Sequence, residues 1–186
     1  MNTAVEILLV VLILLIAGAM LYYYRRQRSE TLHSRFGPEY DRTVVQYGNK
    51  KAAEAELERR AKRVRKFPVH AIPENEKQRF AEAWHAAQTR FVDEPKQAVT
   101  QAHTLVTDLM RARGYPVSEE FEQNADDLSV DHPHVVGHYR KACVIAARRE
   151  NGSANTEDLR AAMVHYRELF EELLGRSTKK SEEVKG

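Results

Sequence analysis

The chain opens with a long run of apolar residues and continues as a series of amphipathic patterns with helical spacing. Residues 7–24 read ILLVVLILLIAGAMLYYY, which is 18 residues without a formal charge. A helix of that length spans about 27 Å at about 1.5 Å per residue, close to the hydrocarbon thickness of a bilayer, about 30 Å. The pattern therefore predicts an all-α protein, in which an N-terminal transmembrane helix precedes a cytoplasmic helical bundle.

The residues that flank this run favour one orientation in the membrane. No Lys or Arg precedes the run, and several arginines follow it directly. The positive-inside rule therefore places the amino terminus outside and residues 25–186 in the cytoplasm, at the inner face of the cytoplasmic membrane. Tyrosine is enriched where the hydrocarbon meets water. The residues expected at this interface are Tyr22, Tyr23, Tyr24, Arg25, Arg26 and Arg28.

A cleaved signal peptide is the alternative interpretation of the apolar run. The segment Ala17-Gly18-Ala19 resembles a small-residue cleavage site. A signal peptide, however, has a basic segment before its apolar region, and this chain carries Glu6 there. The apolar stretch also continues past that site to Tyr24. We therefore expect the run to be retained as a membrane anchor.

Seven amphipathic stretches follow, separated by glycine and proline signals. Pro38 and Gly48 indicate the first of these helices, and in the later stretches apolar residues recur three and four positions apart, as they do on one face of a helix. The asparagines and aspartates at 49, 93, 131 and 155 are expected to cap helices, and the glycines at 48, 114, 152 and 175 are expected to end them. With their caps, the stretches are 38–48, 49–66, 74–92, 93–114, 118–128, 131–152 and 155–175.

The distribution of charge divides the rest of the chain. Residues 25–67 hold 13 basic and 6 acidic side chains, whereas residues 68–186 hold 16 basic and 20 acidic side chains. We therefore predict a transmembrane anchor at 1–24, a basic juxtamembrane helical stalk at 25–67, a helical bundle at 68–174 and a disordered tail at 175–186. Trp84 and Cys143 are expected in the core of the bundle, with Ala146 and Ala147 also facing inward.

A basic cluster in the helix at 50–66 suggests one binding function. Its side chains could neutralise the phosphates of anionic lipid or nucleic acid. No aromatic residues are interleaved for base stacking, so we do not expect nucleic acid to be a partner. A solvated helix face, stabilised by the pairs Glu56–Arg60 and Glu58–Lys62, is the favoured interpretation. The cluster consists of Arg59, Arg60, Lys62, Arg63, Arg65 and Lys66.

A group of histidines offers the best candidate for a metal site. His134 and His138 are four residues apart, a spacing that could present two imidazoles on one helix face. Asp131 or His132 could supply a further ligand, and His165 or Cys143 could approach from a neighbouring helix. The spacing matches no specific metal motif, so we expect Asp131 to cap a helix, His132 to pack beside the turn, and His134 and His138 to face water.

Composition and the absence of motifs exclude several classes of function. The single Cys excludes an internal disulfide and a zinc site built from cysteines. The sequence holds no glycine-rich nucleotide-binding motif, no zinc-protease motif and no serine-hydrolase motif. We therefore expect no catalytic residue, no cofactor and no enzymatic activity.

Several segments resemble one family of uncharacterised bacterial proteins, in which a similar helical domain follows an N-terminal membrane segment. The similar segments are SRFGPEYDRTV at 34–44, RFVDEP at 90–95, ARGYPV at 112–117, FEQNADDLSVDHPHVV at 121–136 and TEDLRAAMVHYRELFEELL at 156–174. The resemblance covers residues 30–174 and implies a bacterial inner membrane and an all-helical fold. It implies no activity, ligand or site residue.

These observations lead to one expected function and two alternatives. We expect a single-pass membrane protein, held in the bilayer by residues 7–24, that acts as a non-enzymatic interaction module for a protein partner. The first alternative is binding of anionic lipid or nucleic acid through residues 50–66. The second is a metal-dependent enzyme that uses Asp131, His132, His134 and His138.

Overall fold

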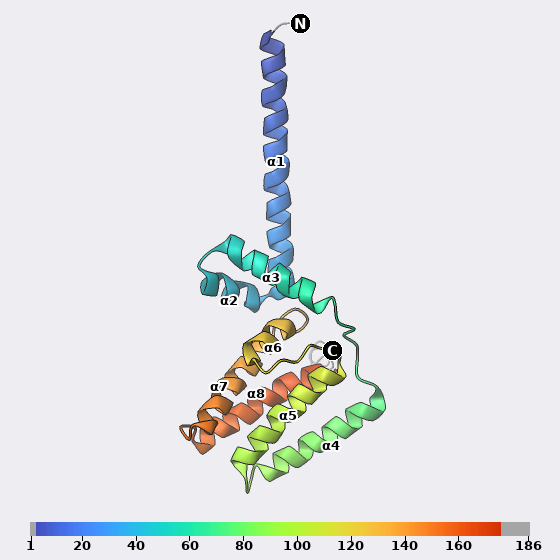
Figure 1. Ribbon diagram of the computed structural model, residues 1–186, viewed down its shortest axis with the longest axis vertical. Coiled ribbons are helices and arrows are strands. Elements are labelled where there is room, and N and C mark those ends of the chain that lie inside the picture. The colour runs from blue at the N-terminus through green and yellow to red at the C-terminus, as the bar shows by residue number, and fades with distance from the viewer. Residues whose placement is uncertain (1–2, 176–186) are drawn as a thin grey trace, which may run out of the picture. The chain divides into compact units, whose positions relative to one another are not determined.

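The computed structural model describes residues 3–175, and every regular element within that range is an α-helix (Figure 1). The all-α prediction is therefore confirmed for this part of the chain. The tail expected to be disordered lies, after Gly175, outside the described residues. The helices are α1 Thr3–Phe36, α2 Pro38–Tyr47, α3 Lys50–Val64, α4 Glu74–Arg90, α5 Pro95–Ala112, α6 Phe121–Leu128, α7 Val136–Glu150 and α8 Thr156–Leu174.

The chain forms two compact units, residues 1–55 and residues 56–186, and the boundary falls inside α3. The sequence placed the start of the bundle at residue 68. The difference arises because the second half of α3 buries the apolar side chains of Leu57, Ala61 and Val64. This half of the helix therefore belongs to the larger unit.

The smaller unit consists of α1, α2 and the start of α3. The helix α1 continues past Tyr24 to Phe36, and its last part buries Leu32 and Phe36. The helix α2 packs against α1 and ends at Gly48, whose φ of 62° is one that glycine adopts readily. The side-chain oxygen of Asn49 then accepts hydrogen bonds from the backbone of the next helix, so this predicted cap is confirmed.

The larger unit is a bundle in which α8 packs against both α5 and α7 (Figure 1). The helix α4 packs on α5, and the short α6 packs on α7. Trp84 of α4 stacks on Phe170 of α8 with ring centroids 4.6 Å apart, so its predicted place in the core is confirmed. Fully buried side chains from several helices form this core: Val99, Val106, Leu109, Met110, Leu128, Tyr139, Tyr166 and Leu169.

The turns around α5 and α8 include one wrong and one confirmed prediction. Asp93 does not cap α5, because the helix begins one residue later, with Glu94 as its N-cap and no side-chain cap. Asn155 does cap α8. Its side chain accepts a hydrogen bond from the backbone of Asp158, and the Asp158 carboxylate accepts one from the backbone of Asn155. This reciprocal pair satisfies two backbone donors at the helix start.

The start of α7 also differs from the prediction. Residues 131–135 form turns and the helix begins at Val136, so Asp131 does not cap it. The Asp131 carboxylate instead accepts a hydrogen bond of 2.9 Å from the hydroxyl of Tyr115. Ala146 is half-buried and Ala147 is exposed, because the last turn of α7 is largely open to solvent. The prediction that both alanines face inward is therefore wrong for Ala147 and only partly met by Ala146.

Candidate functional site

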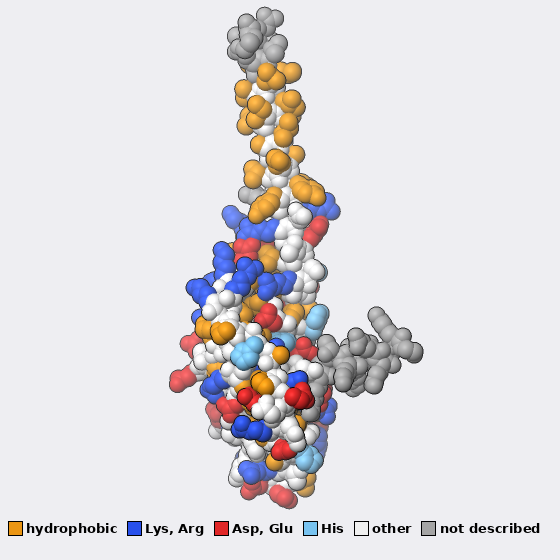
Figure 2. Space-filling model, turned by 90° about the vertical axis from the view of Figure 1, so that its right-hand side faces the viewer, with side chains coloured by type: hydrophobic (Ala, Val, Ile, Leu, Met, Phe, Trp, Pro, Cys, Tyr) orange, Lys and Arg blue, Asp and Glu red, His pale blue; other side chains and the backbone are white. Residues whose placement is uncertain are grey.

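The apolar part of α1 is the most distinctive surface of the smaller unit. It is the one described helix that is long and apolar enough to cross a membrane. Its large apolar side chains between Ile7 and Tyr24 are 49–72% exposed, and Figure 2 shows them uncovered on the face in view. An exposed apolar surface of this size is typical of a segment that contacts a membrane or another protein.

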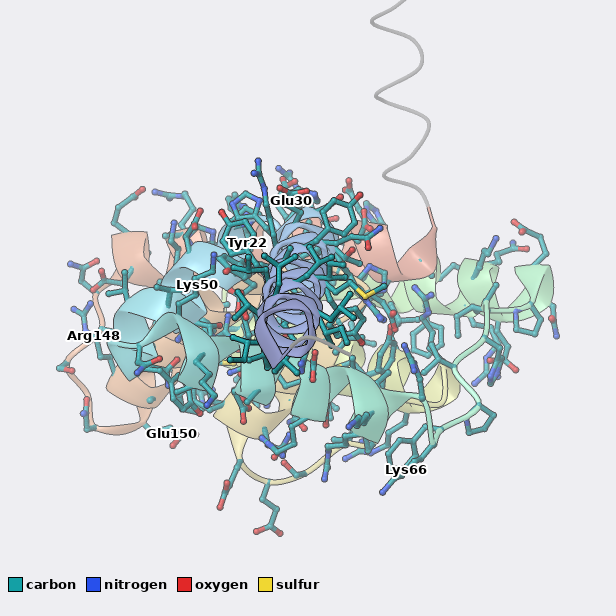
Figure 3. All side chains as sticks on the ribbon, turned by 90° about the horizontal axis from the view of Figure 1, so that it is seen from above. Tyr22, Glu30, Lys50, Lys66, Arg148 and Glu150 are labelled. Atoms are coloured by element: carbon teal, nitrogen blue, oxygen red, sulfur yellow. The ribbon has the colours of Figure 1, made fainter. Side chains whose placement is uncertain are left out.

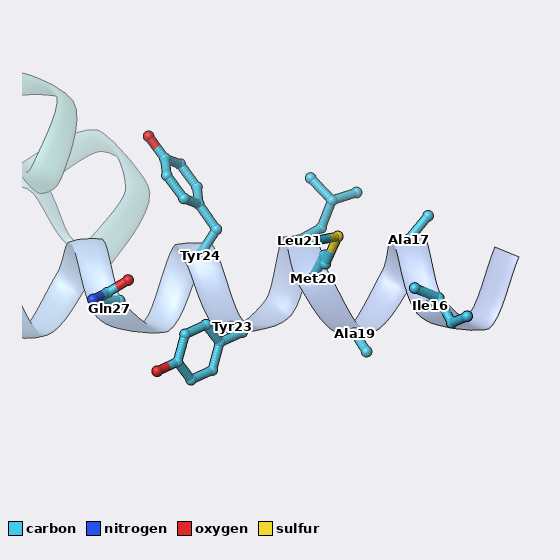
Figure 4. Close-up of a pocket in the computed structure, with 8 residues that line it drawn as sticks. All are labelled: Ile16, Ala17, Ala19, Met20, Leu21, Tyr23, Tyr24 and Gln27. Carbon is cyan, nitrogen blue, oxygen red and sulfur yellow. The ribbon is translucent and has the colours of Figure 1, made fainter. Parts of the chain in front are cut away.

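The hollow beside this part of α1 is only a shallow depression on the open surface of the helix. Figure 4 shows the side chains that line it spread around the helix, with Tyr23 and Tyr24 pointing in opposite directions. They enclose no cavity, so the hollow offers no small-molecule site. The lining consists of Ile16, Ala17, Ala19, Met20, Leu21, Tyr23, Tyr24 and Gln27.

The residues expected at the membrane interface lie at the end of the apolar stretch of α1 and just after it. Tyr22, Tyr23 and Tyr24 are exposed, as is Arg28, while the side chain of Arg25 lies outside the described structure. The Nε of Arg26 donates to Glu30 over 3.0 Å. These positions are compatible with an interfacial belt of aromatic and basic residues.

The start of α3 lies beside residues 22–30 of α1. The sequence alone did not predict this contact. Figure 3 shows Lys50 near Tyr22 and Glu30, and a hollow of about 510 Å³ lies among them. The hydroxyl of Tyr40 donates to the carboxylate of Glu54 over 2.9 Å, which helps to fix this arrangement. Gly37 and Gly48, on either side of the short α2, were the sequence signal that the chain changes direction here. The hollow is lined by Tyr22, Arg26, Ser29, Glu30, Lys50 and Glu54.

The basic cluster of α3 is partly buried in an ion-pair network. Arg60 is 1% exposed, and its guanidinium lies 3.0 Å from Glu56 and 2.9 Å from Asp126 of α6. Arg140 of α7 donates to the same Asp126 oxygen over 3.1 Å and to Glu122 over 3.1 Å. The expectation of a solvated helix face is therefore wrong for Arg60, because nearby carboxylates compensate the charge of its guanidinium.

A second pair joins α3 to α6. The Nε of Arg63 donates to both carboxylate oxygens of Asp127, at 3.0 and 3.1 Å, and the Asp127 side chain is fully buried. Burial raises the pKa of Asp126 and of Asp127, and the arginines act in the opposite direction. These contacts orient α3 in the larger unit and engage two of the six residues proposed to bind phosphate.

The remaining members of the cluster lie on or beside the surface. Arg59 pairs with Glu56 at 2.7 Å, and its side chain is more than half exposed. Lys62, Arg65 and Lys66 are exposed, and Figure 3 shows Lys66 directed outward. An anionic surface could therefore reach only part of the cluster.

The four residues of the candidate metal cluster do not come together. His134 lies exposed in the turn before α7, so it faces water as expected and does not share a helix face with His138, which is half-buried. His132 is buried, with its Nδ1 3.1 Å from a carboxylate oxygen of Glu172. Within residues 3–175, no group of three or more His, Cys, Asp or Glu is arranged to hold a metal ion. His138 instead meets His165 of α8.

Cys143 is buried in the core of the bundle, as expected. Burial raises the pKa of its thiol to about 11. The hydroxyl of Tyr166 lies 3.8 Å from the sulfur and 3.0 Å from the Nδ1 of His103. The thiol is therefore protonated at neutral pH, which is the state of a structural cysteine.

A hollow of about 610 Å³ lies between α4 and α5 in the larger unit. Apolar side chains of Phe80, Ala83 and Leu105 share its lining with charged groups. Sequence reasoning missed it because Phe80 and Leu105 have the spacing of core residues, whereas both are only half-buried. Its charged lining consists of Glu76, Arg79, Glu82 and Asp108.

No protein-family model matches the chain, and neither a curated protein nor a solved structure is significantly similar to it. The resemblance to a bacterial family therefore stays a prediction.

Proposed function

We propose that this protein is a single-pass membrane-anchored interaction module without enzymatic activity, which presents its helical bundle to a protein partner at the inner face of the cytoplasmic membrane. The observation that carries the proposal is the exposed apolar stretch of α1 between Ile7 and Tyr24. A hydrocarbon environment would cover it, and the arginines that follow would hold its end at the cytoplasmic surface.

The hollow between α4 and α5 is the partner surface that we propose. Its apolar lining would receive an apolar side chain, and its carboxylates at Glu76, Glu82 and Asp108 outnumber the single cation of Arg79. Asp108 also pairs with Arg111 at 2.7 Å, which leaves the glutamates as the main acidic groups. The fitting partner is a protein segment that carries an apolar side chain flanked by lysine or arginine.

Photo-crosslinking in living cells tests this surface. The photoreactive residue p-benzoylphenylalanine would replace Phe80 in the hollow or, as the matched control, His85, which is exposed on the same helix outside it. We expect one crosslinked product that contains a partner protein from position 80 and none from position 85. A Glu76→Lys, Glu82→Lys chain with unchanged helicity should lose that product.

The same experiment can contradict the proposal in two ways. Equal crosslinking from both positions would show that the hollow is not a specific surface. A product that persists in the charge-reversed chain would show that the acidic lining does not select the partner.

Binding of anionic lipid is the second candidate function, and the exposure of Lys62, Arg65 and Lys66 favours it. Exposed cations next to a membrane are attracted by about 1 kcal/mol each. Liposome flotation separates this candidate from the first. Residues 25–186 should float with phosphatidylserine vesicles at low salt, and the triple change to glutamine should abolish this if the candidate is correct.

A further inference from the structure

His138 of α7 and His165 of α8 face each other across the contact between these helices. Their Nδ1 atoms are 3.1 Å apart, and the ring centroids are 5.1 Å apart with an interplanar angle of 70°. Both side chains are half-buried, so solvent reaches the pair. The helices that carry them are packed closely, so the two rings are held together by the fold.

The contact brings two metal-ligating atoms into direct apposition. Two neutral imidazoles can make this contact only if one Nδ1 carries a proton and the other offers its lone pair. Burial, together with the nearby His138, lowers the pKa of His165, which favours its neutral form at neutral pH. A neutral imidazole nitrogen is also the form that binds metal ions.

We propose that His138 and His165 form a two-histidine site for a divalent late first-row transition metal ion, bound through both Nδ1 atoms. The ion takes the place of the shared proton, which moves to the Nε2 of the same ring by exchange with water. An ion about 2.05 Å from each nitrogen would make an angle of about 100° with them, which lies between square-planar and tetrahedral geometry. Water completes the coordination because the pair is open to solvent.

The imidazole ligands and the neighbouring charges determine which ions the pair would bind. Imidazole suits Zn²⁺, Ni²⁺ and Cu²⁺, and Cu²⁺ binds a given nitrogen site most tightly of the three. Two charged side chains act on His165 with opposite signs: Lys141 repels a cation and Glu168 attracts one. A bound ion would join α7 to α8 and stabilise the bundle, because the unfolded chain does not hold these histidines together.

Copper titration of the full-length chain in detergent micelles tests the proposal. The protein is first freed of metal with EDTA, and CuCl₂ is then added while the electron paramagnetic resonance spectrum and the unfolding temperature are recorded. We expect a spectrum with coupling to two nitrogens and a higher unfolding temperature. His138→Gln and His165→Gln should each weaken copper binding at least tenfold, whereas His134→Gln, at an exposed histidine outside the pair, should not.

A variant that keeps both histidines separates an effect on copper binding from an effect on folding. Lys141→Gln removes the repelling charge and should tighten copper binding severalfold, with unchanged helicity in the absence of metal. Copper affinity of the His138→Gln, His165→Gln chain equal to that of the wild type would overturn the proposal. Loss of binding in His134→Gln would overturn it too, because the ligand pair would then be His134 and His138.

Discussion

The guanidinium of Arg60 on α3 lies 2.9 Å from the carboxylate of Asp126 on α6, and almost none of the Arg60 side chain is exposed. Arg140 of α7 donates to the same carboxylate oxygen over 3.1 Å. Two cations therefore share one partly buried anion, and three helices meet at this point. One face of the second half of α3 is consequently buried in the bundle, although the composition of this segment is that of a solvated helix.

Arg60→Met should destabilise the larger unit by about 3 kcal/mol, because removing one partner of a buried ion pair leaves the other charge incompletely compensated. The carboxylates left without this cation are Asp126 and Glu56. Urea unfolding of the full-length chain, followed by circular dichroism, measures the change in the free energy of unfolding.

Lys62→Met is the matched control, since Lys62 lies two residues away on the same helix and is exposed. It should change the free energy of unfolding by less than about 0.5 kcal/mol. Equal effects of the two substitutions would contradict a structural role for the buried pair.

His132 should make the stability of the bundle depend on pH. Burial lowers the pKa of this side chain, and the carboxylate of Glu172 opposes that shift only in part. The unfolded chain therefore takes up a proton near pH 6.5, where the folded chain does not. The stabilisation that neutral His132 provides is present above pH 6.5 and is lost as the pH falls through the lowered pKa.

Comparison with His132→Gln isolates this effect from other titrating groups. The stability advantage of the wild type over the variant should shrink between pH 7.5 and pH 5, as measured by urea midpoints at each pH. An advantage that grows at low pH would mean that the charged pair of His132 with Glu172 outweighs burial.

Gly114 should tolerate substitution less well than Gly152. Its φ is 85°, and a Cβ atom there would lie 2.6 Å from the backbone oxygen of Pro68. Gly152 has a similar φ of 76° but nothing within 4 Å of such an atom. Gly152→Ala should therefore cost about 1 kcal/mol from backbone strain alone, and Gly114→Ala about 3 kcal/mol. Thermal unfolding of both variants measures this difference, and equal losses would show that the contact with Pro68 is unimportant.

Local signals in the sequence predicted most of the fold. The unbroken apolar run indicated α1, proline and glycine signals indicated α2, and the helical spacing of apolar residues located the other described helices. Asn49, Asn155, Gly48 and Gly175 marked helix ends correctly. Asp131 was misassigned because a carboxylate that follows a helix can bond either a backbone amide or a distant hydroxyl. Only the fold shows that Tyr115 is the nearer donor.

The candidate sites were harder to predict because they depend on contacts between distant segments. The pairing of Arg60 with Asp126 and of His138 with His165 requires the packing of whole helices, which periodicity does not specify. For His138, the spacing pointed to His134 on the same face, and the later start of α7 removed that neighbour. Sequence reasoning named His165 as a residue that could approach from a neighbouring helix, but spacing alone could not choose it over His134.

Protease treatment of intact spheroplasts that produce the full-length chain tests the membrane anchor most directly. We expect the chain to stay in the membrane pellet after carbonate washing and to begin at its original amino terminus. Residues 25–186 should be protected from the protease until the membrane is broken. Digestion of the helical bundle in intact spheroplasts, or a mature chain that begins near Met20, would contradict it.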